Sequence, residues 1–221
     1  MRPGYDFQGK RVLVVGLART GEAVSLFAAG YGAIVTATDE KSESELAPTA
    51  EKLRAAGVKL ELGGHTPETF LEKDLIVVSP GVPANLPALA KARAAGIPVW
   101  SEIELAWRFL RGKLVAITGS NGKTTTTALV AHILKTAGIP TLVGGNIGTP
   151  LLALVESSTD SSVTVAEVSS FSSKRSKRSG PRLECCSISL RTTSTGTRRS
   201  KNTLPRKCGS SKTSSIAIAL S

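Results

Sequence analysis

The sequence changes character after Phe171, and this change limits what the chain can fold into. Up to that residue, short β-branched apolar runs alternate with glycine turns and helical spacing, a pattern typical of α/β domains with parallel sheets. After it, residues 172–221 show no hydrophobic period and no aromatic side chain. We therefore expect an ordered α/β body followed by a disordered tail.

Charge and cysteine divide at the same point. Residues 172–221 hold 12 of the 28 Lys and Arg residues but one of the 17 Asp and Glu residues, so residues 1–171 hold 16 of each and are neutral overall. A basic chain can indicate a nucleic-acid partner, but this tail has no aromatic side chain to stack on a base. All three cysteines lie in the tail, and adjacent Cys185-Cys186 fits neither a CxxC metal pair nor a disulfide framework. Nucleic-acid binding is therefore disfavoured.

The body contains no signal peptide and no apolar run long enough to span a bilayer. We therefore expect a cytoplasmic, monomeric protein with no membrane partner.

The first strand–turn–helix unit opens the body. An apolar strand over residues 12–15 ends at the turn Gly16–Gly21, and a helix follows to about Ala29. Free N–H groups and the positive end of the helix dipole suit a phosphate. The next strand, 34–38, ends at Asp39, an acid placed to bond hydroxyl groups of a ribose. The middle glycine of G-x-G-x-x-G is absent, which disfavours NAD, and a ligand-free turn stays open as an alternative.

Further alternation follows. Strands are expected at 59–62, 75–78 and 98–99, and helices at 46–56 and 86–95. Ser79-Pro80-Gly81 follows a strand end, where open α/β sheets place ligands, although a rigid turn is an equal alternative. The amphipathic stretch 102–110 is expected to be a packed helix leading into a second domain.

The second strand–turn–helix unit carries the strongest chemical signal. A strand over 114–118 leads into Gly119-Ser120-Asn121-Gly122-Lys123-Thr124-Thr125, and a helix continues to about Thr136. Backbone N–H groups of such a loop surround phosphate oxygens, the lysine contacts the β- and γ-phosphates, and a threonine hydroxyl reaches Mg²⁺. The strict P-loop pattern needs glycine at position 117, where this chain has Ile117. An N-capped turn without a ligand is the alternative.

A second glycine loop, Gly144–Pro150, follows a strand expected at 141–143. The next strand, 163–168, carries the single acid Glu167. An acid at a strand end beside a phosphate loop commonly contacts Mg²⁺; a surface acid is the alternative.

These motifs together resemble the Mur ligases. The resemblance lies in AITGSNGKTTTT, VGGNIGTP and AEVSSF, behind a first unit with VVGLARTG and SPGVP, and it covers residues 5–171. GGNIGTP with EVSSF is similar to the D-glutamate-adding branch. The resemblance implies an α/β fold with a Rossmann-like UDP-sugar domain at 1–111, the first part of a P-loop ATPase domain at 112–171, and a disordered basic tail at 172–221. The family's amino-acid domain would follow.

The resemblance also implies the reaction and its residues. ATP, with Mg²⁺, would phosphorylate the carboxylate of UDP-N-acetylmuramoyl-L-alanine, and the amine of D-glutamate would attack the acyl phosphate. Lys123 and Glu167 would be catalytic, and Thr124 and Glu167 would lie near the metal. ATP would be held by Gly119, Ser120, Asn121, Gly122, Lys123, Thr124 and Thr125. The UDP-sugar would face Arg19, Thr20, Asp39, Ser79, Asn146 and Ser169.

The family continues EVSSF with glutamine, whereas this chain has Ser172. If the codons after Phe171 are read one base out of register, they allow the amino acids that the family has at these positions. We therefore hypothesise that one base is missing there. The chain would then be truncated and inactive, and its second sheet would lose strands and keep an open edge. Two alternatives remain: a non-catalytic UDP-sugar-binding fragment, and a P-loop protein with an RNA-binding basic tail.

Overall fold

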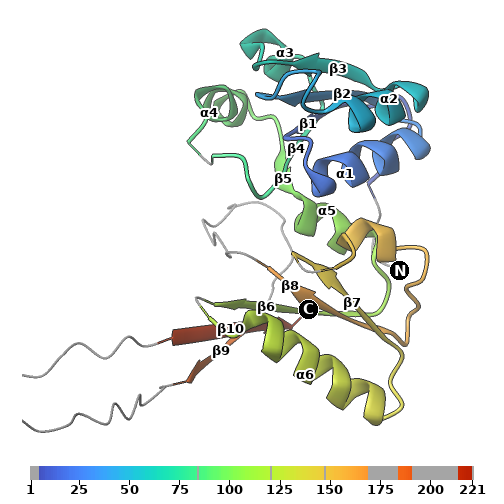
Figure 1. Cartoon of the computed structure of the whole chain (residues 1–221), viewed down its shortest axis with the longest axis vertical. Coiled ribbons are helices and arrows are strands. Elements are labelled where there is room, and N and C mark those ends of the chain that lie inside the picture. Colours follow the sequence, from blue (N-terminus) through green and yellow to red (C-terminus); the bar gives the residue numbers. More distant parts are fainter. Residues whose placement is uncertain are drawn as a thin grey trace, which may run out of the picture.

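The computed structural model describes residues 5–83, 85–119, 121–146, 148–168, 184–190 and 214–220, the last two ranges by their backbone. Within these ranges the chain forms two five-stranded sheets, drawn one above the other in Figure 1.

The first sheet is parallel throughout, in the order β3-β2-β1-β4-β5. Its strands are β1 (Arg11–Val15), β2 (Ile34–Asp39), β3 (Lys59–Leu62), β4 (Leu75–Val78) and β5 (Val99–Ser101). The central strand β1 is buried along residues 12–15, as its unbroken apolar run predicts. This order reverses at β1, so the carboxyl ends of β1 and β4 are where an open sheet holds a ligand.

Helices cover both faces of the first sheet (Figure 1). They are α1 (Arg19–Gly30), α2 (Ala47–Ala55), α3 (Pro67–Leu71), α4 (Pro87–Ala94) and α5 (Glu102–Phe109). Val12 and Val14 pack in the core that contains α1, α2 and α5. Leu13 and Val15 pack on the opposite face against α3 and α4. The alternation of β1 side chains thus divides the helices between two layers. The expected strands and longer helices are confirmed here, while α3 was not expected.

The second sheet has the order β7-β8-β6-β10-β9. Its elements are β6 (Lys113–Gly119), α6 (Lys123–Thr136), β7 (Thr141–Gly145), the 3₁₀ helix η1 (Leu151–Leu154), β8 (Val163–Glu167), β9 (Glu184–Leu190) and β10 (Ser214–Leu220). β7, β8 and β6 are parallel. β10 is antiparallel to β6, and β9 is antiparallel to β10.

Two expectations for the tail are wrong. Residues 184–190 and 214–220 are strands and not part of a disordered tail, and β6 does not keep an open edge, because β10 pairs with it. The physical reason lies in the strand β6 itself: an unpaired edge presents free N–H and C=O groups to any extended segment of suitable propensity. The sequence of β10, SSIAIAL, offers two strand-favouring isoleucines and contains no proline or charged side chain that would oppose pairing. The rest of residues 169–221 lies outside the described residues.

The two sheets share one hydrophobic core. Leu105 of α5, Leu114 of β6, Leu151 and Leu152 of η1 and Ala166 of β8 all belong to the cluster that contains the inner face of the first sheet. The helix α5 lies between the sheets in Figure 1. Its N-cap is Ser101, whose Oγ accepts a hydrogen bond from the Glu104 N–H (3.2 Å). The packed linker helix expected at 102–110 is therefore confirmed.

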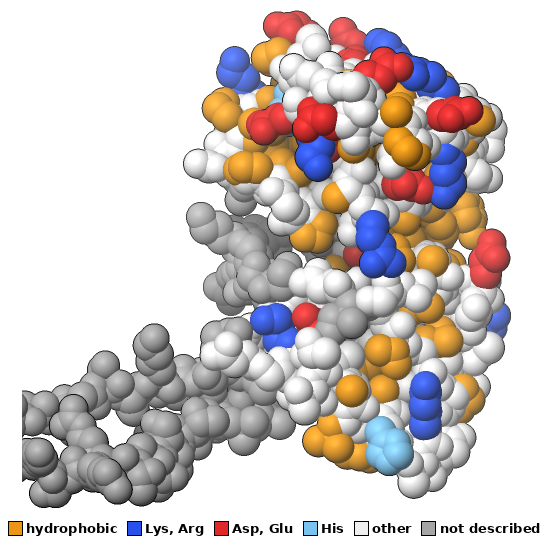
Figure 2. All heavy atoms as spheres, in the orientation of Figure 1, with side chains coloured by type: hydrophobic (Ala, Val, Ile, Leu, Met, Phe, Trp, Pro, Cys, Tyr) orange, Lys and Arg blue, Asp and Glu red, His pale blue; other side chains and the backbone are white. Residues whose placement is uncertain are grey.

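The visible surface carries both signs of charge. Figure 2 shows Lys, Arg, Asp and Glu side chains interspersed over the coloured part of this face. Leu129 and Ile133 of α6 are each 56% exposed. Among the described residues, no helix is both long and apolar enough to cross a membrane.

Candidate functional site

The turn between β1 and α1 is closed tightly around two glycines. Gly16 has a φ of +87°, and a Cβ there would lie 2.7 Å from Val82 Cγ2. A Cβ on Gly21 would overlap the Gly16 carbonyl oxygen. Both positions therefore need glycine, one because of its left-handed backbone and both because of close approach.

Asp39 holds this turn from the end of β2. Its Oδ2 accepts a hydrogen bond from the Leu17 N–H (2.5 Å), and its Oδ1 accepts one from the Lys41 N–H (2.9 Å). Both oxygens of the carboxylate are thus engaged by backbone. The sequence placed Asp39 against the UDP-sugar; in the structure it braces the glycine turn and does not line the cavity described next.

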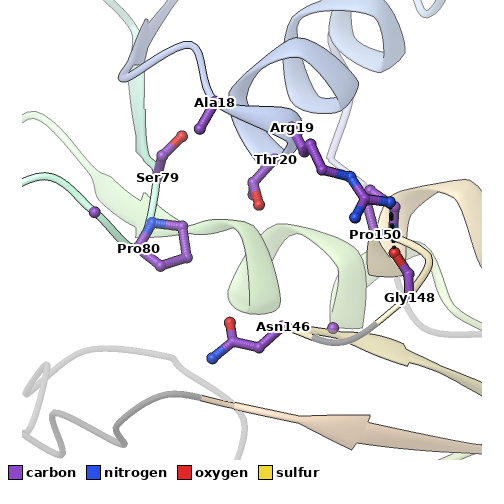
Figure 3. A pocket seen from close by; sticks show the side chains of 10 residues that line it. Ala18, Arg19, Thr20, Ser79, Pro80, Asn146, Gly148 and Pro150 are labelled. Carbon is purple, nitrogen blue, oxygen red and sulfur yellow. Dashed lines mark hydrogen bonds between the residues drawn. The ribbon is translucent and has the colours of Figure 1, made fainter.

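A cavity of about 180 Å³ lies between the two sheets. One wall is the β1–α1 turn with Arg19 and Thr20, and the loop after β4 with Ser79. The facing wall is the glycine loop after β7, with Asn146 (Figure 3). Ala18, Pro80, Gly81, Gly145, Gly148 and Pro150 complete the lining. Four of the six predicted UDP-sugar residues are therefore brought together, while Ser169 lies outside the described residues.

Two contacts set the shape of this cavity. The Ser79 hydroxyl donates to the Gly16 carbonyl (2.8 Å), which joins the β4 loop to the first turn. The Arg19 guanidinium Nη2 donates to the Gly148 carbonyl (2.7 Å) across the cavity, drawn as a dashed line in Figure 3. The second contact connects α1 of the first unit to the glycine loop of the second unit.

The turn between β6 and α6 has the geometry of a phosphate loop. Gly122, the N-cap of α6, has a φ of +74°, and its N-cap position carries no side-chain hydrogen bond. Lys123 is the first residue of α6, and its Nζ donates to the Gly119 carbonyl (2.8 Å). The first N–H groups of a helix have no intrahelical acceptor, so this end offers them to an anion. Asn121 lies in the same turn, Thr125 lies in the first turn of α6, and Ser120 lies outside the described residues.

Thr124 and Glu167 meet beside this loop. The Thr124 hydroxyl donates to Glu167 Oε2 at 3.0 Å. Glu167 is 6% exposed at the end of β8. The described residues contain no group of three or more His, Cys, Asp or Glu side chains able to hold a metal by themselves. A hydroxyl and one carboxylate nevertheless fit Mg²⁺, which takes one or two carboxylates together with substrate phosphates and water.

Glu167 also joins the phosphate loop to the cavity. Its backbone carbonyl accepts a hydrogen bond from the Asn146 N–H (2.9 Å), and a Cβ on Gly145 would overlap the same carbonyl. One residue at the end of β8 therefore contacts Thr124 through its side chain and Asn146 through its backbone. The two predicted sites are neighbours in the structure, since the carboxyl ends of the parallel strands β6, β7 and β8 meet at one sheet edge.

Comparison with known proteins identifies the family of the chain that carries these two sites. Residues 10–101 match the family model "Mur ligase MurD-like, N-terminal domain", and residues 117–185 match "Mur ligase middle domain". The chain belongs to the Mur ligase family. The resemblance predicted from its motifs is thereby confirmed, as is the α/β fold with a Rossmann-like first domain and the start of the central domain. The middle-domain match does not stop at Phe171.

Named relatives of this chain support the same family. It is 52% identical over 178 residues to UDP-N-acetylmuramoylalanine--D-glutamate ligase of Geotalea daltonii, covering 80% of this chain and 39% of that relative. It is 54% identical over 166 residues to the enzyme of the same name from Geotalea uraniireducens, covering 75% and 37%. The chain thus spans about two fifths of the length of the curated relatives it matches.

Among solved structures, a pseudomurein peptide ligase type C from Methanothermus fervidus is similar at a TM-score of 0.43 and 27% identity, covering 74% of this chain and 33% of that one.

Proposed function

We propose that this chain carries the UDP-sugar site and the ATP loop of a ligase that joins D-glutamate to UDP-N-acetylmuramoyl-L-alanine through an acyl phosphate. Its relatives bear the name of that activity. The cavity between the sheets would take part of the nucleotide-sugar, and the β6–α6 loop would take ATP.

The observation that carries this proposal is the double contact of Glu167. An acyl phosphate forms only if the γ-phosphate of ATP lies close to the carboxylate of the other substrate. Thr124 in the phosphate loop and Asn146 in the cavity wall both bond to Glu167, one to its side chain and one to its carbonyl. Ligands on the two sides of this residue would therefore be neighbours.

The residues of the cavity suit a diphosphate and a sugar. Arg19 is a cation at the start of α1, whose free N–H groups also favour an anion. Thr20, Ser79 and Asn146 offer hydroxyl and amide groups to a sugar or base. At about 180 Å³ the cavity is smaller than the roughly 300–1,000 Å³ of typical ligand sites. The nucleotide-sugar would thus extend along the junction of the two sheets.

The phosphate loop would act by charge and position. Lys123 would turn its ammonium from the Gly119 carbonyl toward the β- and γ-phosphates. Thr124 and Glu167 would hold Mg²⁺, which neutralises charge on the transferring phosphoryl group. Bringing several anionic oxygens together is the main electrostatic demand of this reaction, and these groups meet it.

We further propose that the 221-residue chain by itself binds these ligands without completing ligation. The family resemblance assigns D-glutamate to a domain beyond the region matched here. The missing base at the Phe171/Ser172 junction remains a hypothesis, tested by sequencing the gene across the codon for Phe171. An intact frame would refute it. The cytoplasmic location and monomeric state also remain predictions.

The proposed function is tested by ligation and binding assays on the same preparation. We expect saturable binding of Mg·ATP and of UDP-N-acetylmuramoyl-L-alanine, with no transfer of labelled D-glutamate. Turnover at a normal rate would contradict the claim of inactivity, and absence of both binding events would contradict the assignment of the sites. Binding of the uridine nucleotide alone would favour the non-catalytic UDP-sugar-binding fragment, whose cavity is formed by described residues.

A further inference from the structure

Glu102 joins the two sheets through a buried carboxylate. It is the first residue of α5 and is 4% exposed. Its Oε1 accepts hydrogen bonds from the N–H groups of Leu151 (2.8 Å) and Leu152 (3.3 Å), which open η1. The acceptor thus belongs to the linker helix after the first sheet, while both donors belong to the second unit.

This carboxylate has no ion-pair partner among the described residues. Burial raises the pKa of Glu102, and the two N–H donors oppose that rise. A buried carboxyl group is unfavourable unless it is hydrogen-bonded, and buried N–H groups are equally unfavourable without an acceptor. Glu102 and the start of η1 therefore depend on each other.

The segment held by Glu102 leads directly from the cavity wall. Pro150, which lines the cavity, precedes Leu151. At the other end of the wall, the Asn146 N–H is bonded to the Glu167 carbonyl, and the Gly145 N–H to the Thr149 carbonyl (2.9 Å). The glycine loop is thus fixed at its beginning by β8 and at its end by Glu102.

We propose that Glu102 is a positioning residue for the UDP-sugar site: it sets the place of the Gly145–Pro150 wall relative to the Thr20 and Ser79 wall. The inference rests on the proposed function of the cavity. Removal of the carboxylate leaves the Leu151 and Leu152 N–H groups without their acceptor. The end of the glycine loop then loses this connection to the first domain while it keeps the Arg19 contact to the Gly148 carbonyl, so Asn146 no longer faces the opposite wall at the right distance.

The matched variants are Glu102→Ala, Glu102→Gln and the control Glu104→Ala. Glutamine keeps an oxygen acceptor for the two N–H groups and removes the charge. Glu104 lies on the same helix and pairs with Arg108 (3.3 Å). It therefore reports the loss of a partly buried acid from α5 that leaves the Glu102 contact to η1 intact.

Two measurements on the full chain test the proposal. Amide hydrogen exchange measures, without any ligand, the protection of residues 148–152 apart from Pro150, which has no N–H group. Titration calorimetry reads the affinities for UDP-N-acetylmuramoyl-L-alanine and for Mg·ATP. For Glu102→Ala we expect faster exchange in that segment, because two buried N–H groups lose their acceptor, and about tenfold weaker binding of the uridine nucleotide. Mg·ATP affinity should stay within about twofold, and Glu102→Gln should restore uridine binding.

The outcomes distinguish failure of the positioning role of Glu102 from failure of the proposed function on which it rests, which is uridine-nucleotide binding in the cavity. Unchanged exchange and unchanged uridine affinity in Glu102→Ala would overturn the inference, as would an equal loss of both affinities. If the unmodified chain binds no uridine nucleotide, the proposed function fails, and exchange alone decides whether Glu102 positions the loop. Should Glu102→Ala not fold, Glu102→Asp, which retracts the carboxylate by one methylene, carries the same test.

Discussion

The β1–α1 turn and the β6–α6 turn share a plan: a buried strand, a glycine turn and the N-terminus of a helix. Their surroundings differ. In the first turn, Asp39 accepts the Leu17 N–H and Ser79 donates to the Gly16 carbonyl. In the second, Lys123 and Thr124 bond to Gly119 and Glu167.

This difference teaches that the glycine turn alone does not select its ligand. The first turn is braced from within the first domain and presents Arg19 and Thr20 to a cavity. The second has a lysine, a hydroxyl and an acid, the groups that a nucleoside triphosphate with Mg²⁺ requires. The side chains that follow each glycine turn, and those that reach it from neighbouring strands, decide what it can hold.

The first turn should be the more sensitive to added volume. Gly21→Ala places a methyl group against the Gly16 carbonyl oxygen. We expect the free energy of unfolding to fall by about 3 kcal/mol or more, at the upper end for overpacking. Urea denaturation followed by tryptophan fluorescence measures the change. Gly30→Ala, at the other end of α1 with no atom within 4 Å of the new Cβ, is the control. Equal denaturation midpoints for the two variants would show that the turn is not closed as described.

The second turn should be the more sensitive to loss of charge. Lys123→Ala removes the ammonium expected on the β- and γ-phosphates. We expect Mg·ATP affinity to fall about 10- to 100-fold, because one hydrogen bond between charged groups is lost. The affinity for the uridine nucleotide should stay unchanged. Titration calorimetry with both ligands measures this. Lys135→Ala, in the last turn of the same helix, should leave both affinities unaltered. A parallel loss of both affinities would remove the distinction between the turns.

The hydrogen bonds of Asp39 to the first turn can be weakened by a substitution with a smaller expected effect. Asp39→Asn keeps one oxygen acceptor, so either the Leu17 or the Lys41 N–H loses its partner. We expect about 1–2 kcal/mol lower stability and weaker uridine binding, with Mg·ATP binding retained. Denaturation and calorimetry together check this. Glu40→Gln, an exposed neighbour, should change stability by less than about 0.5 kcal/mol. If the two variants behave alike, Asp39 does not brace the turn.

The smallest expected effect concerns pH. Because burial raises the pKa of Glu102, the folded chain keeps a proton that the unfolded chain has already released. This contribution to stability is therefore present below the ordinary glutamate pKa and is lost as pH rises toward the raised value. Glu102→Gln removes this dependence, so its stability relative to the unmodified chain should increase across that window. Urea denaturation from about pH 4 to about pH 7 measures it. Parallel stability curves would contradict the raised pKa.

The sequence predicts many of the strands and helices, but it does not predict which residues form long-range hydrogen bonds with each other. The apolar run at residues 12–15 and the glycine-lysine turn at 119–125 specify their strands and helices through local pattern. Asp39 has the right position for a ribose contact, yet its bonding to the Leu17 N–H depends on how β1 and β2 register. Similarly, the sequence pattern indicates only that Glu102 is an acid in the first turn of a helix. Its hydrogen-bond partners in η1 lie 49 and 50 residues away, so no local pattern reveals them.

The tail shows another limit of pattern reading. The apolar run of β10 is the five residues IAIAL after a Ser-rich, basic stretch, and it is too short for periodicity to mark it as a strand. Its strand β10 depends on the edge of β6, an element almost 100 residues earlier in the chain. Tertiary context of this kind overrides local composition.

The central claim is that the two turns hold two different ligands at the same time. Calorimetric titration of UDP-N-acetylmuramoyl-L-alanine into the chain, with and without saturating Mg·ATP, tests this most directly. We predict one binding event for each ligand, with the uridine nucleotide still binding when ATP is present. Displacement of one ligand by the other would contradict the account.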